Sequence, residues 1–104
     1  MSLHVWPTLD ADADIAALAV WWSENRPAAR DQFDNEIRRA WQVLAESPNV
    51  GTPYPSADIP GLRRLRLRRT PYLVYYVPRP DHGDVVVIAV WSGMRGEGPP
   101  LRMP

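Results

Sequence analysis

Residues 62–91 read LRRLRLRRTPYLVYYVPRPDHGDVVVIAVW, and this stretch decides the fold. Residues 62–68 alternate apolar and basic side chains, which predicts a strand with leucines on one face and arginines on the other. Residues 72–77 are aromatic and β-branched and predict a second strand. A polar segment with two prolines and a glycine, 78–84, then turns the chain. Residues 85–91 are continuously apolar, as expected for a third strand near the centre of a sheet.

Two amphipathic helices are predicted before these strands. The first carries one apolar stripe at helical spacing, formed by Ile15, Leu18, Ala19 and Trp22. Thr8 or Asp10 can cap its start, and Pro27 ends it near Asn25. The second helix is expected to take Pro27 into its first turn and to end before Pro48. Its apolar face is the clearest of the sequence and consists of Phe33, Ile37, Ala40, Trp41 and Leu44. The short break between the helices predicts an antiparallel hairpin.

The remaining segments complete an α+β fold. Residues 2–7 predict a first or edge strand, 48–61 a proline-rich connecting loop, and 93–104 an irregular tail. The predicted order is β-α-α-β-β-β, with the helical hairpin packed on one face of a small, mostly antiparallel sheet. A chain of 104 residues predicts a single domain, 1–104.

Composition excludes several classes of function. The sequence has no cysteine, and its two histidines lie far apart without ligand spacing, so we expect neither a metal site nor a cofactor. The longest apolar run is too short to cross a bilayer, and the N-terminus does not resemble a signal peptide. These features predict a cytoplasmic protein without a membrane partner.

Charge is unevenly distributed although the net charge is zero. Residues 1–60 hold nine acidic residues and four arginines, about −5, whereas residues 61–104 hold eight arginines and three acidic residues, about +5. All twelve cations are arginines, whose planar groups suit carboxylates and phosphates. The pattern indicates a local basic patch on a neutral protein.

Five short motifs together resemble the RelE/ParE superfamily of bacterial toxins from type II toxin–antitoxin pairs. They are Ala11-x-x-Asp14-Ile15, Leu44-x-x-x-Pro48-x-x-Gly51, Pro60-Gly61-Leu62-Arg63-Arg64-Leu65, Pro71-Tyr72-x-x-Tyr75-Tyr76 and Val86-x-Ile88-x-Val90-Trp91-x-x-x-Arg95. Their order and spacing match over roughly ninety residues. The resemblance implies a small toxin that is neutralised by a cognate antitoxin and acts either on translation or on DNA gyrase.

The basic strand supplies most of the candidate site residues. Arg64, Arg66 and Arg68 are expected about 7 Å apart on one strand face, close to the spacing of phosphates in extended RNA. The predicted target- or antitoxin-binding surface comprises Arg63, Arg64, Arg66, Arg68, Tyr72, Trp91 and Arg95. By resemblance to the nuclease members, Arg64, Arg66 and Arg95 would be catalytic if the chain were a metal-independent mRNA endoribonuclease. A docking or solvated surface is the favoured interpretation over catalysis.

Three departures from the nuclease pattern support that preference. Leu73 and Ser92 stand where nuclease members tend to carry basic or histidine side chains, and residues 93–104 contain no tyrosine. Arginine itself stays protonated and is a poor general base. The favoured hypothesis is therefore a ParE-like toxin that binds a macromolecular target such as DNA gyrase without chemistry of its own. A RelE-like ribosome-dependent mRNA endonuclease and a non-toxic interaction module with the same fold remain the alternatives.

Further expectations concern the partner and the aromatic residues. An antitoxin segment with acidic and apolar side chains is expected to cover the basic sheet face and the helical hairpin, giving an oligomer with the antitoxin. Because Tyr72, Tyr75 and Tyr76 alternate across a strand, not all three are expected to be buried. Acidic residues of the second helix, Glu36 among them, are expected on a solvated face.

Overall fold

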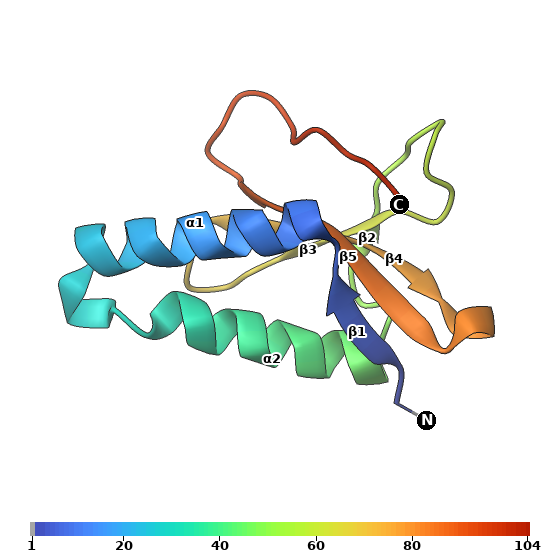
Figure 1. Cartoon of the computed structure of the whole chain (residues 1–104), viewed down its shortest axis with the longest axis horizontal. Coiled ribbons are helices and arrows are strands. Elements are labelled where there is room, and N and C mark those ends of the chain that lie inside the picture. Colours follow the sequence, from blue (N-terminus) through green and yellow to red (C-terminus); the bar gives the residue numbers. More distant parts are fainter. Residues whose placement is uncertain (1) are drawn as a thin grey trace.

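The computed structural model describes residues 2–104 and confirms the predicted α+β order. The elements are β1 (His4–Pro7), α1 (Leu9–Asn25), a 3₁₀ turn (Pro27–Ala29), α2 (Gln32–Glu46), β2 (Thr52–Pro53), β3 (Arg63–Arg66), β4 (Tyr72–Arg79), a second 3₁₀ turn (Pro80–His82) and β5 (Asp84–Ser92). Figure 1 shows α1 and α2 side by side as a hairpin next to the sheet. The short strand β2 lies in the segment that the sequence predicted to be loop.

The five strands form one sheet in the order β1-β5-β4-β3-β2. Only the β1–β5 pair is parallel, and the other neighbours are antiparallel. A register shift between Tyr75 and Tyr76 leaves Ile88 of β5 without a partner on β4, a β-bulge of the kind that bends the strand carrying the extra residue. Arg66, Leu73 and Trp91 lie level across β3, β4 and β5, and His4 lies level with Asp84 at the other end of β5.

The helices begin and end for local chemical reasons. Thr8 caps α1, because its hydroxyl accepts a hydrogen bond from the Ala11 N–H at 3.2 Å, and α1 ends at Asn25 as predicted. The prediction that Pro27 lies in the first turn of α2 is wrong, since Pro27 starts a separate 3₁₀ turn and α2 begins at Gln32. The Trp22 indole donates to the Ala29 carbonyl at 2.8 Å and holds this turn against α1.

Both faces of the sheet are covered by apolar side chains. On the helix side, Trp22, Phe33 and Leu44 pack against sheet residues such as Tyr76 and Val87. On the opposite side, a second cluster around Leu73, Tyr75 and Ile88 is covered by Ile59 and Leu62 of the β2–β3 connection and by Leu101 and Met103 of the irregular tail. The tail is therefore part of the packed structure although it has no regular secondary structure.

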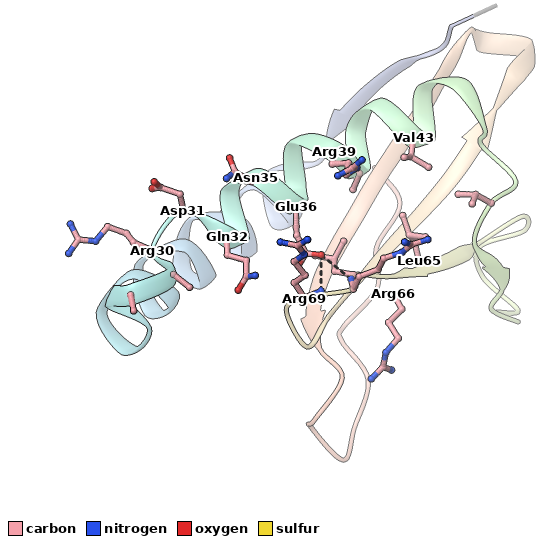
Figure 2. A pocket seen from close by; sticks show the side chains of 16 residues that line it. Arg30, Asp31, Gln32, Asn35, Glu36, Arg39, Val43, Leu65, Arg66 and Arg69 are labelled. Carbon is pink, nitrogen blue, oxygen red and sulfur yellow. Dashed lines mark hydrogen bonds between the residues drawn. The ribbon is translucent and has the colours of Figure 1, made fainter.

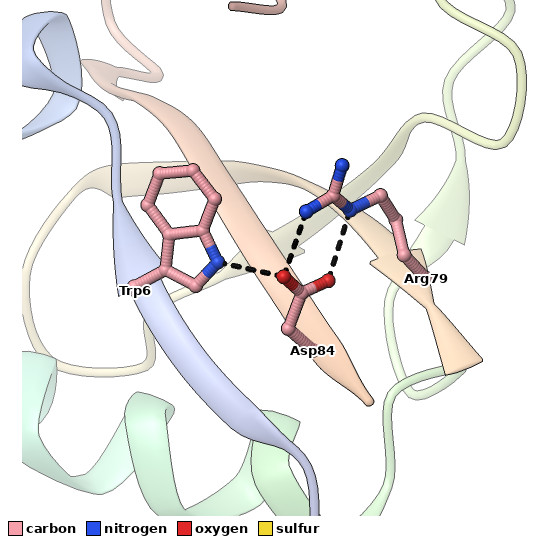
Figure 3. Close-up of polar contacts among 3 residues, drawn as sticks. All are labelled: Trp6, Arg79 and Asp84. Atoms are coloured by element: carbon pink, nitrogen blue, oxygen red, sulfur yellow. Dashed lines mark hydrogen bonds and ion pairs between the residues drawn. The ribbon is translucent and has the colours of Figure 1, made fainter. Parts of the chain in front are cut away.

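An ion pair at one end of the sheet joins three strands. Asp84 at the start of β5 accepts two hydrogen bonds from Arg79, at 2.9 and 2.7 Å, and one from the Trp6 indole at 2.9 Å (Figure 3). Hydrogen bonding to Arg79 is the main reason why the pKa of Asp84 falls from 3.8 to about 2. No role could be assigned to Trp6 from the sequence, because its partner is 78 residues away. No helix in residues 2–104 has the length and apolar character needed to cross a bilayer.

Candidate functional site

An open groove runs between α2 and β3, with a volume of about 840 Å³ (Figure 2). Its apolar residues include Ala40 and Val43 from α2, together with Leu65 and Leu67. Its polar lining carries five arginines, namely Arg30, Arg39, Arg66, Arg68 and Arg69, against two acidic residues, Asp31 and Glu36. This α2–β3 groove therefore combines apolar surface with an excess of positive charge, a combination that suits an acidic peptide with apolar side chains.

Glu36 builds one side of the α2–β3 groove by binding the turn that follows β3. Its carboxylate accepts hydrogen bonds from the backbone N–H groups of Arg68 and Arg69, both at 2.9 Å. It also accepts from the N–H of Thr70 at 2.8 Å and from the Thr70 hydroxyl at 2.7 Å. The expectation that Glu36 is merely solvated is thus wrong, because the carboxylate fixes the backbone of the segment that carries two groove arginines.

The arginines of β3 do not form the single row that the sequence predicted. Arg64 and Arg66 do share a face, and the Arg64 guanidinium lies 5.2 Å from the centre of the Tyr54 ring. Arg63 points the other way, and its guanidinium donates to the carbonyls of Asn49, at 3.2 Å, and of Gly51. Arg68 lies beyond the end of β3, where the chain has already begun to turn. The prediction that Arg68 lies on the strand is therefore wrong. The side chain of Arg63 forms hydrogen bonds within the protein and is not free to bind a target.

Trp91, near the end of β5, and Arg95, in the segment after β5, lie close together two strands away from β3. The Arg95 guanidinium is 4.4 Å from the centre of the Trp91 ring, and the Trp91 indole donates to the Glu97 carbonyl at 3.0 Å. Because Trp91 and Arg66 are level across the sheet and two strands apart, their backbones are about 10 Å from each other. We call the set Arg64, Arg66, Trp91 and Arg95 the platform. Arg66 also borders the α2–β3 groove, with its guanidinium pointing away from α2 (Figure 2).

Tyr72, which the sequence placed on the binding surface, is buried. Its side chain is 3% exposed and packs edge-on against Trp22 and Phe33. Tyr75 and Tyr76 are also buried, so the expectation that some of these tyrosines are exposed is wrong. The physical reason is that apolar side chains cover both faces of the sheet. Burial raises the pKa of the Tyr72 and Tyr76 hydroxyl groups, which makes ionised forms less accessible.

Both histidines are distant from the platform. His4 and His82 lie at the start of β5, whereas Trp91 lies seven residues further along, about 23 Å away for an extended strand. Asp14 is closer to Arg95, and burial raises its pKa, but its carboxylate accepts the Val90 N–H at 3.1 Å. Within residues 2–104, no group of three or more His, Cys, Asp or Glu side chains is arranged to hold a metal ion. The platform is thus equipped to bind anions and aromatic rings.

The fold and its basic surface define a class of protein. Two solved structures resemble the chain: "Chromosomal ParDE TA system from P. aeruginosa", with a TM-score of 0.69 and 21% identity, covering 88% of this chain and 96% of that one; and the toxin–antitoxin complex RelBE2 from Mycobacterium tuberculosis, with a TM-score of 0.63 and 22% identity, covering 88% and 99%. At these identities the likeness establishes a RelE/ParE-like fold.

The sequence itself narrows the assignment. Residues 7–96 match the model of the family described as "ParE toxin of type II toxin-antitoxin system, parDE". No curated protein matches the sequence. Because the family match extends over most of the chain, the chain belongs to the ParE toxin family of the RelE/ParE toxins.

Proposed function

We propose that this ParE-family chain acts by binding a macromolecular target such as DNA gyrase, without chemistry of its own. The observation that carries the proposal is the separation of both histidines from the platform along β5, about 17 Å to the level of Arg64 and about 23 Å to Trp91. Arg64, Arg66 and Arg95 can hold anionic groups of a target, but none of them can accept a proton at neutral pH. Trp91 adds an aromatic surface next to Arg95.

A gyrase supercoiling assay tests this proposal. The purified chain is expected to inhibit supercoiling, and the double variant Arg66→Ala/Arg95→Ala is expected to inhibit at least tenfold less. Arg38→Ala is the matched control, since Arg38 is an exposed arginine on α2 that lies outside both the platform and the α2–β3 groove. Absence of inhibition by the unmodified chain, well above its cellular concentration, would refute gyrase as the target.

The proposed partner is an antitoxin whose acidic and apolar segment lies in the α2–β3 groove. The groove offers apolar residues from α2 and β3 together with five arginines, so both kinds of side chain would find a counterpart. The two similar solved structures are described as toxin–antitoxin assemblies, which supports an oligomer of this kind. Titration with the product of the adjacent reading frame tests it: Arg39→Ala should weaken binding and Arg38→Ala should leave it unchanged.

A second candidate is a RelE-like mRNA endonuclease, favoured only by the shared face of Arg64 and Arg66 and by the nearby Arg95. Primer extension on mRNA from expressing cells separates the two candidates, because a ribosome-dependent nuclease leaves cuts in codon register. Growth arrest without such cuts would exclude the nuclease hypothesis. Absence of any growth arrest on induction would instead support a non-toxic module with the same fold.

A further inference from the structure

Helix α1 carries apolar side chains on its outer side as well as on its inner side. The inner side, formed by Ala11, Ile15, Leu18, Ala19 and Trp22, packs against the sheet and α2. The outer side consists of Leu9, Ala13, Ala16, Ala17, Val20 and Trp21, all of them exposed. The spacings 4, 3, 1, 3 and 1 place these residues on one continuous strip, which we call the α1 stripe. Leu9 is 90% exposed, Val20 58% and Trp21 46%.

The neighbouring helix shows what an ordinary outer side looks like in this protein. On α2, exposed positions carry Asp34, Asn35, Arg38, Arg39 and Gln42. Both helices belong to the same hairpin and face the same sheet, so their different outer sides do not follow from the fold alone. A surface helix with apolar residues all round is typical of a helix that is covered on both sides.

We propose that a second copy of this chain packs on the α1 stripe, with the two α1 helices antiparallel around a twofold axis near Ala16 and Ala17. The centre of the stripe consists of alanines, which allow two helix backbones to approach closely. In the antiparallel arrangement, Ala13 of one copy lies opposite Val20 of the other, and Leu9 lies opposite Glu24, where it can contact the aliphatic part of that side chain. A twofold interface requires a surface that complements itself, and a stripe with small residues in its middle and large ones at its ends meets this requirement.

Charges at the two ends of α1 favour the antiparallel orientation. Asp10 and Asp12 lie exposed in the first turn, and the Arg102 guanidinium lies 3.7 Å from Asp10, which leaves a charge of about −1 at this end. The opposite end carries Glu24 and Arg26, whose charges cancel, and the Arg26 guanidinium lies 5.7 Å from the centre of the Trp21 ring. Antiparallel packing keeps the aspartates of the two copies apart and opposes the helix dipoles, whereas parallel packing would place the aspartates of both copies side by side.

The size of the stripe predicts a weak dimer. From Leu9 to Trp21 the stripe is about 18 Å long, so the interface would lie near the lower bound of about 1,000 Å² expected for specific complexes. The stripe and the α2–β3 groove have no residue in common. The proposed dimer is therefore independent of the proposed function, and an occupied groove does not by itself prevent it.

Light scattering on the purified chain tests the dimer. The measured mass is expected to approach twice the 11.8 kDa of the chain at about 100 µM, and Ala17→Arg is expected to weaken association at least tenfold, because like charges meet at the twofold axis. Ala57→Arg, at an exposed alanine of the β2–β3 connection, is the control and should still dimerise. A monomeric mass for the unmodified chain at this concentration, or dimers of Ala17→Arg that are as stable as those of the parent, would overturn the proposal.

Cysteine cross-linking tests the register and does not depend on the arginine variant being folded. The chain contains no cysteine, so a single introduced thiol reports on one position only. Ala17→Cys should form a covalent dimer on oxidation, because the two thiols meet near the twofold axis, whereas Leu9→Cys should not. Equal cross-linking at both positions, or none at Ala17→Cys, would contradict the arrangement. Loss of antitoxin binding in Ala17→Arg would assign the stripe to the antitoxin and would also overturn the proposal.

Discussion

Replacing Glu36 by alanine should destabilise the protein by about 2–3 kcal/mol. The carboxylate accepts four hydrogen bonds from residues 68–70, and hydrogen bonds to charged groups contribute about 1.5–3 kcal/mol each. Two of the four donors belong to exposed residues, Arg68 and Arg69, whose N–H groups can bond to water in the variant. Most of the loss therefore comes from Thr70, which is 3% exposed and would keep a buried hydroxyl and N–H without a partner.

Urea unfolding followed by circular dichroism measures this loss, and hydrogen exchange locates it. The amides of residues 68–70 should exchange faster in Glu36→Ala, while those of β4 and β5 should lose protection only in proportion to global stability. Glu36→Gln should lose about half as much, since the amide oxygen can still accept but the charge is gone. Asp34→Ala is the control, because it removes an exposed carboxylate from the same helix and should change stability by less than about 0.5 kcal/mol. A loss of stability below about 0.5 kcal/mol in Glu36→Ala, with unchanged hydrogen exchange at residues 68–70, would refute the reasoning.

Two further substitutions follow from the geometry. Asp84→Asn should lower stability at pH 7 and make stability depend less on pH in acid. The folded pKa of about 2 lies below 3.8, so the carboxylate contributes stability above pH 4 that is lost as the pH falls toward 2. The urea midpoints of parent and variant, measured at pH 7, 4 and 2.5, should therefore converge as the pH falls. Gly51→Ala should cost about 1–3 kcal/mol, because a Cβ there would lie 2.7 Å from both the Arg64 carbonyl oxygen and the Tyr76 hydroxyl. Gly96→Ala, which meets nothing within 4 Å, should unfold at the same urea concentration as the parent, and equal midpoints for all three proteins would contradict the Gly51 prediction.

Periodicity explains which parts of the fold the sequence could predict. The helical spacing around Phe33 and the alternation around Leu65 each refer to one element and one face, and both elements form close to where they were expected. Tyr72 was misplaced because alternation does not show which face of β4 the helices cover, and its side chain lies on the helix side. Tyr75 lies on the opposite face, which alternation implies is solvated. The cover of that face comes partly from Leu101 and Met103, in a tail without regular structure and therefore without a periodic signal.

The candidate site shows the same division between local and distant contacts. Alternation correctly placed Arg64 and Arg66 on a common face. It could not show that Arg63 is drawn to carbonyls 12 and 14 residues earlier in the chain, nor that Glu36 binds a turn more than 30 residues away. Both contacts depend on how distant segments meet in space. An arginine at position 63 or a glutamate at position 36 could equally be a surface group, so the residue types alone do not reveal the structural role.

Arg66 links the two proposed surfaces and suggests how an antitoxin would neutralise the chain. Its side chain is exposed, it lines the α2–β3 groove, and it lies level with Trp91 on the platform. Under the proposed function, an acidic segment that continues from the groove over the edge of β3 would pair with Arg66 and so withdraw one of three arginines from the target. Neutralisation would then need no change in the conformation of the toxin. A guanidinium that forms a bidentate pair with an antitoxin carboxylate cannot form the same pair with an anion of the target.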